Sequence, residues 1–114
     1  MTAAAPGAED ALDGVFRALG DPTRRAMLRL LAAGERTIGE LAAPFSMTFA
    51  GASKHVKVLE GAGLVRRTVR GRTHVCRLEA APLAAADAWL RYYAAFWDDR
   101  IDALEAQLRR EAGA

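Results

Sequence analysis

The chain of 114 residues contains few of the residues that build disulfides, metal sites or membrane spans. Its single cysteine, Cys76, cannot form a disulfide within the chain, and there are only two histidines. The longest stretch without a charged residue, 41–53, has thirteen residues and includes Pro44, whereas a membrane-spanning helix needs roughly 18. The first residues have neither the basic start nor the apolar segment of a signal peptide. We therefore expect a cytoplasmic protein with no membrane partner.

Proline is also scarce, and recognisable catalytic patterns are missing. Only four prolines interrupt the chain and 52% of its residues are hydrophobic, so we expect one mostly helical domain with its own core. The sequence has no Ser-His-Asp arrangement, no glycine-rich phosphate loop and no histidine-rich metal motif. We therefore do not expect an enzyme, a cofactor or a resident metal.

Capping residues and apolar spacing predict four helices in the first half of the chain. Asp21 and Thr48 are typical N-cap residues, and Thr37 with Glu40 has the spacing of a capping box. The small, uncharged residues 1–8 are expected to form a disordered tail, followed by a single domain over residues 9–114. The expected helices cover residues 9–19, 22–33, 38–45 and 49–62.

The pattern changes from helical to alternating between Leu64 and Leu78. This alternation of β-branched and basic residues predicts a two-stranded hairpin that turns at Gly71. A long last helix is expected from Pro82 to about Arg110. Two short helices, a tight turn, a further helix and a hairpin together predict a winged helix-turn-helix, a mostly α (α+β) fold with a β-hairpin wing and a long C-terminal helix.

Positive charge is concentrated in the middle of the chain. Residues 48–77 hold seven Lys and Arg against Glu60 alone, a net charge of +6. Residues 1–47 and 78–114 have net charges of −1 and −3. A localised basic region between acidic ends is typical of a surface that contacts nucleic acid.

The fourth predicted helix has one apolar face and one face of small or basic residues. At 100° per residue it buries Ala52, Val56 and Leu59 and turns the opposite face outward. The DNA major groove admits one helix of this kind, and basic residues at the hairpin tip can reach the adjacent minor groove or the backbone. The expected DNA-binding residues are Ala50, Ser53, Lys54 and Lys57 on the helix and Arg70 and Arg72 at the tip.

Two sequence blocks resemble the ArsR/SmtB family of bacterial repressors. They are FRALGDPTRR at residues 16–25 and ASKHVKVLEGAGLV at residues 52–65. The resemblance, which extends from about Leu12 to Leu108, implies a homodimeric winged-helix transcription factor, usually a repressor, that binds a pseudo-palindromic operator in double-stranded DNA. It also places Thr48, Ser53, Lys54 and His55 at recognition-helix positions. For His55, a half-buried place in the core is the alternative interpretation.

The metal-sensing motifs of that family are missing. Residues 40–45 carry no Cys-x-Cys pair, and residues 82–114 carry no histidine. His74 and Cys76 lie two residues apart on one strand face, which gives two ligands where a closed zinc site needs four. We therefore expect a branch of the family without a metal site. A redox switch at Cys76 is left as an alternative, and it requires an exposed thiol with a low pKa.

The terminal segment carries five of the eight aromatic residues. Residues between Leu90 and Leu108 recur at spacings of three and four, which predicts an apolar seam, and a second stripe lies beside it. One helix with two apolar stripes needs two partners, its own domain and a second subunit, and the resemblance implies pairing through the first and last helices. The expected dimer-interface residues are Leu12, Phe16, Trp89, Tyr93, Trp97, Ile101, Leu104 and Leu108.

Two further interpretations stay open. The aromatic residues at the expected interface are also suited to a pocket for a small-molecule effector of unknown identity. Alternatively, the winged helix binds a protein partner and no nucleic acid. The salt dependence of the binding affinity distinguishes a protein partner from DNA. Binding to phosphates releases counterions, so the affinity for DNA falls steeply as the salt concentration rises.

Overall fold

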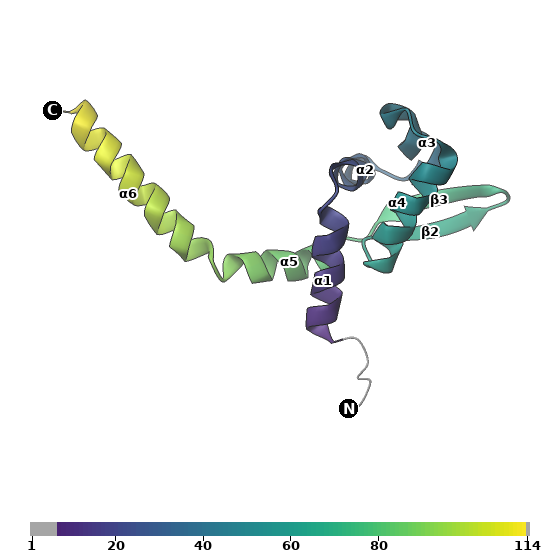
Figure 1. The fold of residues 1–114 in the computed structure, drawn as a ribbon, viewed down its shortest axis with the longest axis horizontal. Coiled ribbons are helices and arrows are strands. Elements are labelled where there is room, and N and C mark those ends of the chain that lie inside the picture. Colours follow the sequence, from purple (N-terminus) through teal and green to yellow (C-terminus); the bar gives the residue numbers. More distant parts are fainter. Residues whose placement is uncertain (1–6, 114) are drawn as a thin grey trace.

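The structure, a computed structural model, describes residues 7–113 (Figure 1). Over this range the chain forms a winged helix-turn-helix with an arm that projects from it. The elements are, in order, α1 (Ala8–Leu19), α2 (Pro22–Ala33), β1 (Arg36–Thr37), α3 (Ile38–Ala42), the 3-10 helix η1 (Ala43–Phe45), α4 (Phe49–Gly61), β2 (Val65–Arg70), β3 (Thr73–Leu78), α5 (Ala81–Arg91) and α6 (Ala94–Ala112).

The predicted N-caps begin the helices where expected. The Asp21 carboxylate accepts a hydrogen bond from the Arg24 N–H at 2.9 Å, and Thr48 Oγ1 accepts one from the Gly51 N–H at 3.0 Å. Thr37 and Glu40 form the reciprocal capping box at the start of α3. Each side chain satisfies a backbone N–H that has no partner within its helix. The capping signals therefore fix the positions of α2, α3 and α4.

The chain start and the third helix differ from the expectation in detail. Gly7 is the N-cap of α1 and the helix begins at Ala8, one residue before the expected start at residue 9. Residues 1–6 lie outside the described residues. The expected helix 38–45 is α-helical only to Ala42 and continues as the 3-10 helix η1. Pro44 lacks the N–H that an α-helical turn would use there.

The expected two-stranded sheet has a third strand. The short strand β1 pairs antiparallel with β3, with Arg36 opposite Cys76 and Thr37 opposite Val75, and the strand order is β1-β3-β2. The hairpin itself is confirmed, since β2 and β3 pair from Val65 to Leu78 and turn at Gly71, which has a φ of +66°. A strand of two residues is too short to give an alternating pattern, so its sequence carries no signal.

The prediction of a single long terminal helix is wrong. The chain forms α5 and α6 with a break at Tyr92 and Tyr93. Neither residue is a Gly or Pro that would mark a break in the sequence, but their rings pack edge to face with centroids 4.9 Å apart. Trp89 also packs against Tyr93, with centroids 5.0 Å apart. The bend thus contains a cluster of packed aromatic rings, which the spacing of the apolar residues did not predict.

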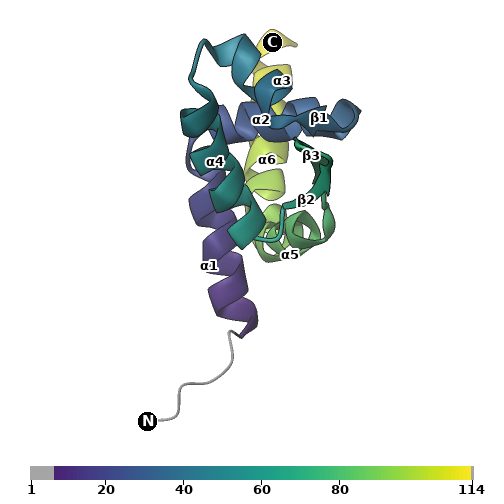
Figure 2. The same cartoon turned by 90° about the vertical axis from the view of Figure 1, so that its right-hand side faces the viewer.

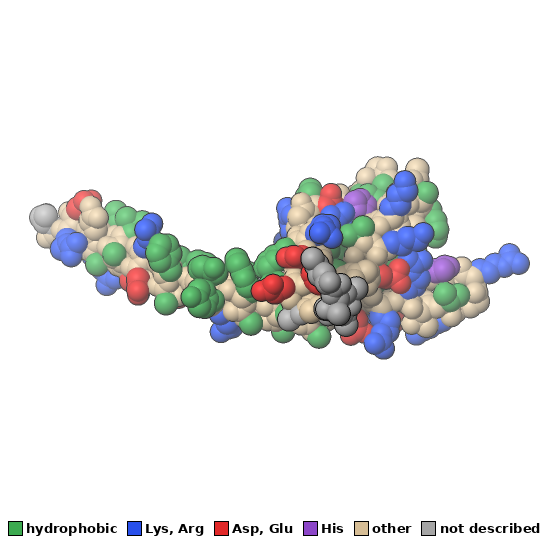
Figure 3. Space-filling model, turned by 60° about the horizontal axis from the view of Figure 1, so that its bottom comes forward, with side chains coloured by type: hydrophobic (Ala, Val, Ile, Leu, Met, Phe, Trp, Pro, Cys, Tyr) green, Lys and Arg blue, Asp and Glu red, His purple; other side chains and the backbone are tan. Residues whose placement is uncertain are grey.

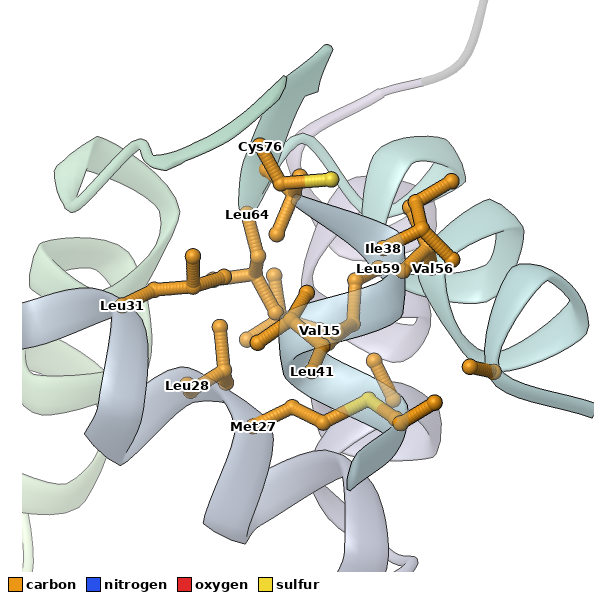
Figure 4. Close-up of a cluster of buried hydrophobic side chains, with 14 of the residues drawn as sticks. Val15, Met27, Leu28, Leu31, Ile38, Leu41, Val56, Leu59, Leu64 and Cys76 are labelled. Carbon is orange, nitrogen blue, oxygen red and sulfur yellow. The ribbon is translucent and has the colours of Figure 1, made fainter. Parts of the chain in front are cut away.

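One hydrophobic core joins α1 to α5 and the strands (Figure 4). It buries the predicted stripe of α4, since Ala52, Val56 and Leu59 are each fully buried. This burial fixes the rotation of α4 about its axis and turns its small and basic face outward. The largest fully buried side chains are Met27, Ile38, Leu41, Leu59, Leu64, Val15, Val56 and Cys76.

The last two helices give the molecule an elongated shape. The radius of gyration is 19.3 Å, whereas a compact domain of this length has one of about 13 Å. Figure 1 shows the reason, because α5 extends past α1 and α6 projects away from the other helices. The main packing partner of α6 is α5. Among the described residues, no helix is both long and apolar enough to cross a membrane.

Candidate nucleic-acid interface

The helix α4 and the β2–β3 hairpin lie on the same side of the molecule, which Figure 2 shows face on. On α4, Ala50, Lys54 and Lys57 are exposed and Ser53 is half-buried. Arg70 and Arg72 flank the hairpin turn and are exposed. We call this set the basic face: Ala50, Ser53, Lys54, Lys57, Arg70 and Arg72.

Two other predicted DNA-binding residues have contacts within the chain. Thr48 caps α4 through its hydroxyl, so its side-chain oxygen is already engaged. His55 is half-buried, with Nδ1 3.4 Å from Arg24 Nη1 and 3.9 Å from Asp21 Oδ2. The structure thus places His55 at the junction of α4 with α2, which is the alternative that the sequence left open.

The pKa of the Asp21 carboxyl is lowered, first by the hydrogen bond from the Arg24 backbone N–H and then by the nearby charges of His55 and Arg24. An ionised carboxylate is the better acceptor for the N-cap bond. The same residue therefore caps α2 and contributes the negative charge beside His55.

The Arg24 and Arg25 side chains tie α2 to the end of α1. Arg24 donates from Nε to the Ala18 carbonyl at 2.8 Å and from Nη2 to the Arg17 carbonyl at 3.0 Å. Arg25 Nη1 donates to the Leu19 carbonyl at 2.7 Å. These carbonyls belong to the last turn of α1, whose acceptors have no partners within the helix. The two arginines have a structural role that sequence reasoning missed, and the block at residues 16–25 was the only signal for it.

Arg67 fixes the hairpin to α4. Its side chain is only 15% exposed, and its guanidinium forms an ion pair with Glu60 of α4. Arg67 Nη1 also lies 3.4 Å from His74 Nδ1 on the neighbouring strand. This arginine is therefore turned inward, unlike Arg70 and Arg72, and it sets the position of the wing relative to α4.

The Cys76 thiol does not have the properties that a redox switch requires. Its side chain is fully buried, and burial raises the pKa of the thiol. A reactive cysteine needs the opposite, exposure and a low pKa, so the redox interpretation is contradicted. His74 lies beside Arg67 rather than in a ligand cluster, and no group of three or more candidate metal ligands occurs within residues 7–113.

The predicted dimer-interface residues fall into two groups. Leu12 and Phe16 are partly buried on α1, and Trp89 of α5 packs edge to face on Phe16 with centroids 5.5 Å apart. These three residues, with Asp13, line an open cavity of about 310 Å³. Trp89 itself remains 47% exposed. The residues of the expected seam and those of the second stripe, which are Trp89, Tyr92 and Phe96, are all exposed along the last two helices. Of the second stripe, Trp89 alone packs on a ring of α1, so the expectation that one stripe packs on its own domain holds only for Trp89.

We call the exposed hydrophobic surface of the last two helices the apolar arm. Figure 3 shows hydrophobic side chains gathered along this arm, and Lys and Arg side chains gathered at the opposite end of the molecule. The two surfaces are therefore well separated. The apolar arm consists of Trp89, Leu90, Tyr92, Tyr93, Phe96, Trp97, Ile101, Leu104 and Leu108.

Comparison with known proteins identifies the family. A family model described as a helix-turn-helix domain matches residues 19–68. The chain is also similar to a crystal structure of an ArsR family transcriptional regulator, with 41% identity and a TM-score of 0.73, covering 79% of this chain and 93% of that one. The chain belongs to the ArsR family of transcriptional regulators.

Two further similar proteins agree with this assignment. The chain is 30% identical over 79 residues to the transcriptional repressor SdpR of Bacillus subtilis (strain 168), covering 69% of this chain and 88% of SdpR. It is also similar to the homodimeric winged helix-turn-helix DNA-binding domain Mb0332 of Mycobacterium bovis, a possible ArsR-family regulator. That similarity has 29% identity and a TM-score of 0.61, and covers 82% of this chain and 84% of the other.

Proposed function

We propose that this ArsR-family protein is a homodimeric repressor that binds a pseudo-palindromic operator through its basic face. The observation that carries the proposal is the orientation of α4. Its buried stripe of Ala52, Val56 and Leu59 turns a face of mostly small and basic side chains outward, with the exposed Phe49 at the start of the helix. A helix with such a face can enter the major groove. In this proposal the protein binds DNA in the cytoplasm and catalyses no reaction.

The wing is suited to a supporting role. Arg70 and Arg72 are exposed at the hairpin tip, and Arg67 holds the hairpin against α4 through Glu60. With α4 in the major groove, the tip arginines lie where they can contact the backbone or enter the adjacent minor groove. They therefore add affinity through phosphates more than sequence preference.

The apolar arm supports the dimer. Nine large hydrophobic residues are exposed on α5, on α6 and at the break between them, and monomeric proteins rarely expose a continuous patch of this size. A two-fold pairing of the arms would cover it. The same pairing can place two copies of α4 about 34 Å apart, which is one turn of B-DNA. The repressor role and the dimer agree with the descriptions of SdpR and of the M. bovis domain.

Salt dependence is the direct test of DNA binding. The DNA is a duplex enriched by binding selection from random sequences. The protein is titrated into it at salt concentrations between about 50 and about 300 mM, and binding is measured by fluorescence anisotropy. We expect the affinity to fall steeply, and Arg72→Ala to reduce the slope of log K against log salt by about one. A flat salt dependence, or failure to enrich any sequence, would instead favour a module that binds a protein partner.

A second candidate function is effector binding at the cavity between α1 and α5. Its lining of Leu12, Phe16 and Trp89 is apolar, and Asp13 supplies one carboxylate. An apolar molecule with a single cationic or donor group fits this lining. Repeating the binding selection with and without metals and candidate small molecules would show whether affinity responds to any of them.

A further inference from the structure

Phe49, the first residue of α4, is the largest exposed hydrophobic residue of α4 and the hairpin. Its side chain is 59% exposed, and it directly follows the Thr48 N-cap. A single exposed hydrophobic residue carries little meaning by itself. The position of Phe49 is more informative than its exposure.

Phe49 lines a cleft of about 370 Å³ between α4 and the wing. The other walls are Thr37, Ile38 and Gly39 at the start of α3 and Arg72, Thr73 and His74 of the hairpin. Phe49 of α4 and Arg72 of the wing therefore line the same cleft. Along α4, Phe49 also begins a row at intervals of four residues, Phe49, Ser53 and Lys57, which lie on one side of a helix.

The chemistry of the ring limits what it can recognise in DNA. Residues at the N-terminus of a recognition helix are those that reach the base edges. A phenyl ring neither donates nor accepts a conventional hydrogen bond, so it cannot read the polar groups of the bases. In the major groove, the C5-methyl group of thymine is the apolar feature that distinguishes one base pair from another.

We propose that Phe49 reads a thymine in each half-site by packing its ring against the C5-methyl group. The inference rests on the proposed function, because it requires α4 to lie in the major groove. The neighbouring Ser53, Lys54 and Lys57 then supply polar and phosphate contacts, and Phe49 supplies an apolar specificity contact.

The test removes the methyl group from the DNA. In the selected duplex, each thymine is replaced in turn by deoxyuridine at the matching position of both half-sites. For the wild type, we expect one position at which the replacement weakens binding about fourfold per half-site, the change that corresponds to one buried carbon group. Phe49→Ala should bind the thymine and deoxyuridine duplexes equally at that position.

Val58→Ala is the matched control, since it truncates another exposed hydrophobic residue of α4, nine positions further along the helix and not among the residues that line this cleft. It should keep the full deoxyuridine penalty. An equal penalty in Phe49→Ala and the wild type at every position would overturn the inference. So would a loss of affinity in Phe49→Ala that is the same for selected and scrambled duplexes, because the ring would then contact the backbone.

A second measurement uses the wild type alone, so it does not depend on how a variant folds. Iododeoxyuridine at the sensitive position puts an iodine in place of the methyl group, and irradiation cross-links it to a side chain in contact. Mass spectrometry should locate the cross-link at Phe49, and a cross-link elsewhere would refute the proposal. If the wild type binds no duplex in a salt-dependent manner, the proposed function itself fails. A flat deoxyuridine series on a tightly bound duplex refutes only the role of Phe49.

Discussion

Lys54 and Lys57 are the residues through which charge on α4 can reach DNA without affecting the fold. Both are exposed, on the side opposite the fully buried Ala52 and Val56. If the proposed function is right, their substitution removes interactions with DNA phosphates or bases, and it leaves the core intact.

We predict that Lys54→Ala and Lys57→Ala each weaken binding to the selected duplex, with a change of less than about 0.5 kcal/mol in the free energy of unfolding. If the lysines contact phosphates, the salt slope should fall by about 0.9 for each. Arg110→Ala, which removes the same charge from an exposed position of α6, is the matched control for both readouts. A variant that unfolds readily yet binds DNA normally would show that α4 is rotated from this orientation.

Asp21 and Glu40 couple the helix starts to pH. Backbone hydrogen bonds, from the N–H groups of Arg24 and Thr37 respectively, are the main causes that lower the pKa of these two carboxyls in the folded protein. A carboxyl with a lowered pKa stabilises the fold above the pKa of the unfolded chain, and the contribution is lost as the pH falls through the folded-state value.

We therefore expect stability to decrease as the pH is lowered below about 4.5, where both carboxyls begin to take up protons in the unfolded chain. The double variant Asp21→Asn with Glu40→Gln keeps polar caps but cannot titrate, so its urea midpoint should vary less between about pH 5 and pH 3. Asp102→Asn, on an exposed turn of α6, is the control. An identical pH dependence in the double variant and the wild type would exclude these caps as the cause.

At the scale of elements, the attachment of the wing to α4 rests on Glu60 and Arg67. Arg67 is mostly buried, so removing its carboxylate partner leaves a positive charge unpaired in a poorly solvated place. We predict that Glu60→Gln destabilises the fold by roughly 3 kcal/mol and also weakens DNA binding, because the hairpin is no longer held.

A double-mutant cycle with Arg67→Met measures this coupling by urea denaturation. The two changes together should cost less than the sum of the single changes. Arg66→Met, on the same strand, is the control variant, because Arg66 is exposed and pairs with Glu79 rather than with Glu60. Additive effects of Glu60→Gln and Arg67→Met would contradict the account of the wing.

The helices and strands differ in how well the sequence predicts them. The orientation of Lys54 and the starts of α2, α3 and α4 were predictable, because a cap and a 100° repeat are local properties of consecutive residues. The strand β1 pairs with residues about forty positions away, and the break between α5 and α6 falls at Tyr92 and Tyr93, where neither a Gly nor a Pro marks it. The inward contacts of Arg24 and Arg67 likewise require the distant elements to be in place, and no local pattern reports them.

For the whole molecule, the apolar arm and the basic face should act together through the dimer. We predict that Leu104→Glu lowers dimer stability and operator affinity in parallel, because it places a charge in the apolar arm, far from the basic face. Ala95→Glu adds the same charge to another side of α6 and is expected to leave both unchanged. Analytical ultracentrifugation and anisotropy on the same samples provide the check. If the Leu104→Glu protein is monomeric and still binds the operator with normal affinity, the predicted link between the dimer and DNA binding is wrong.

The most direct test of a dimer that reads DNA is the symmetry of the sequence it selects. Binding selection from random duplexes, followed by sequencing, reveals an operator of any sequence. We predict two inverted half-sites with centres about 10–10.5 base pairs apart, since each α4 of a two-fold dimer meets the major groove one turn from the other. A single half-site bound by a 12.2 kDa monomer, or enrichment of no sequence at all, would contradict this prediction.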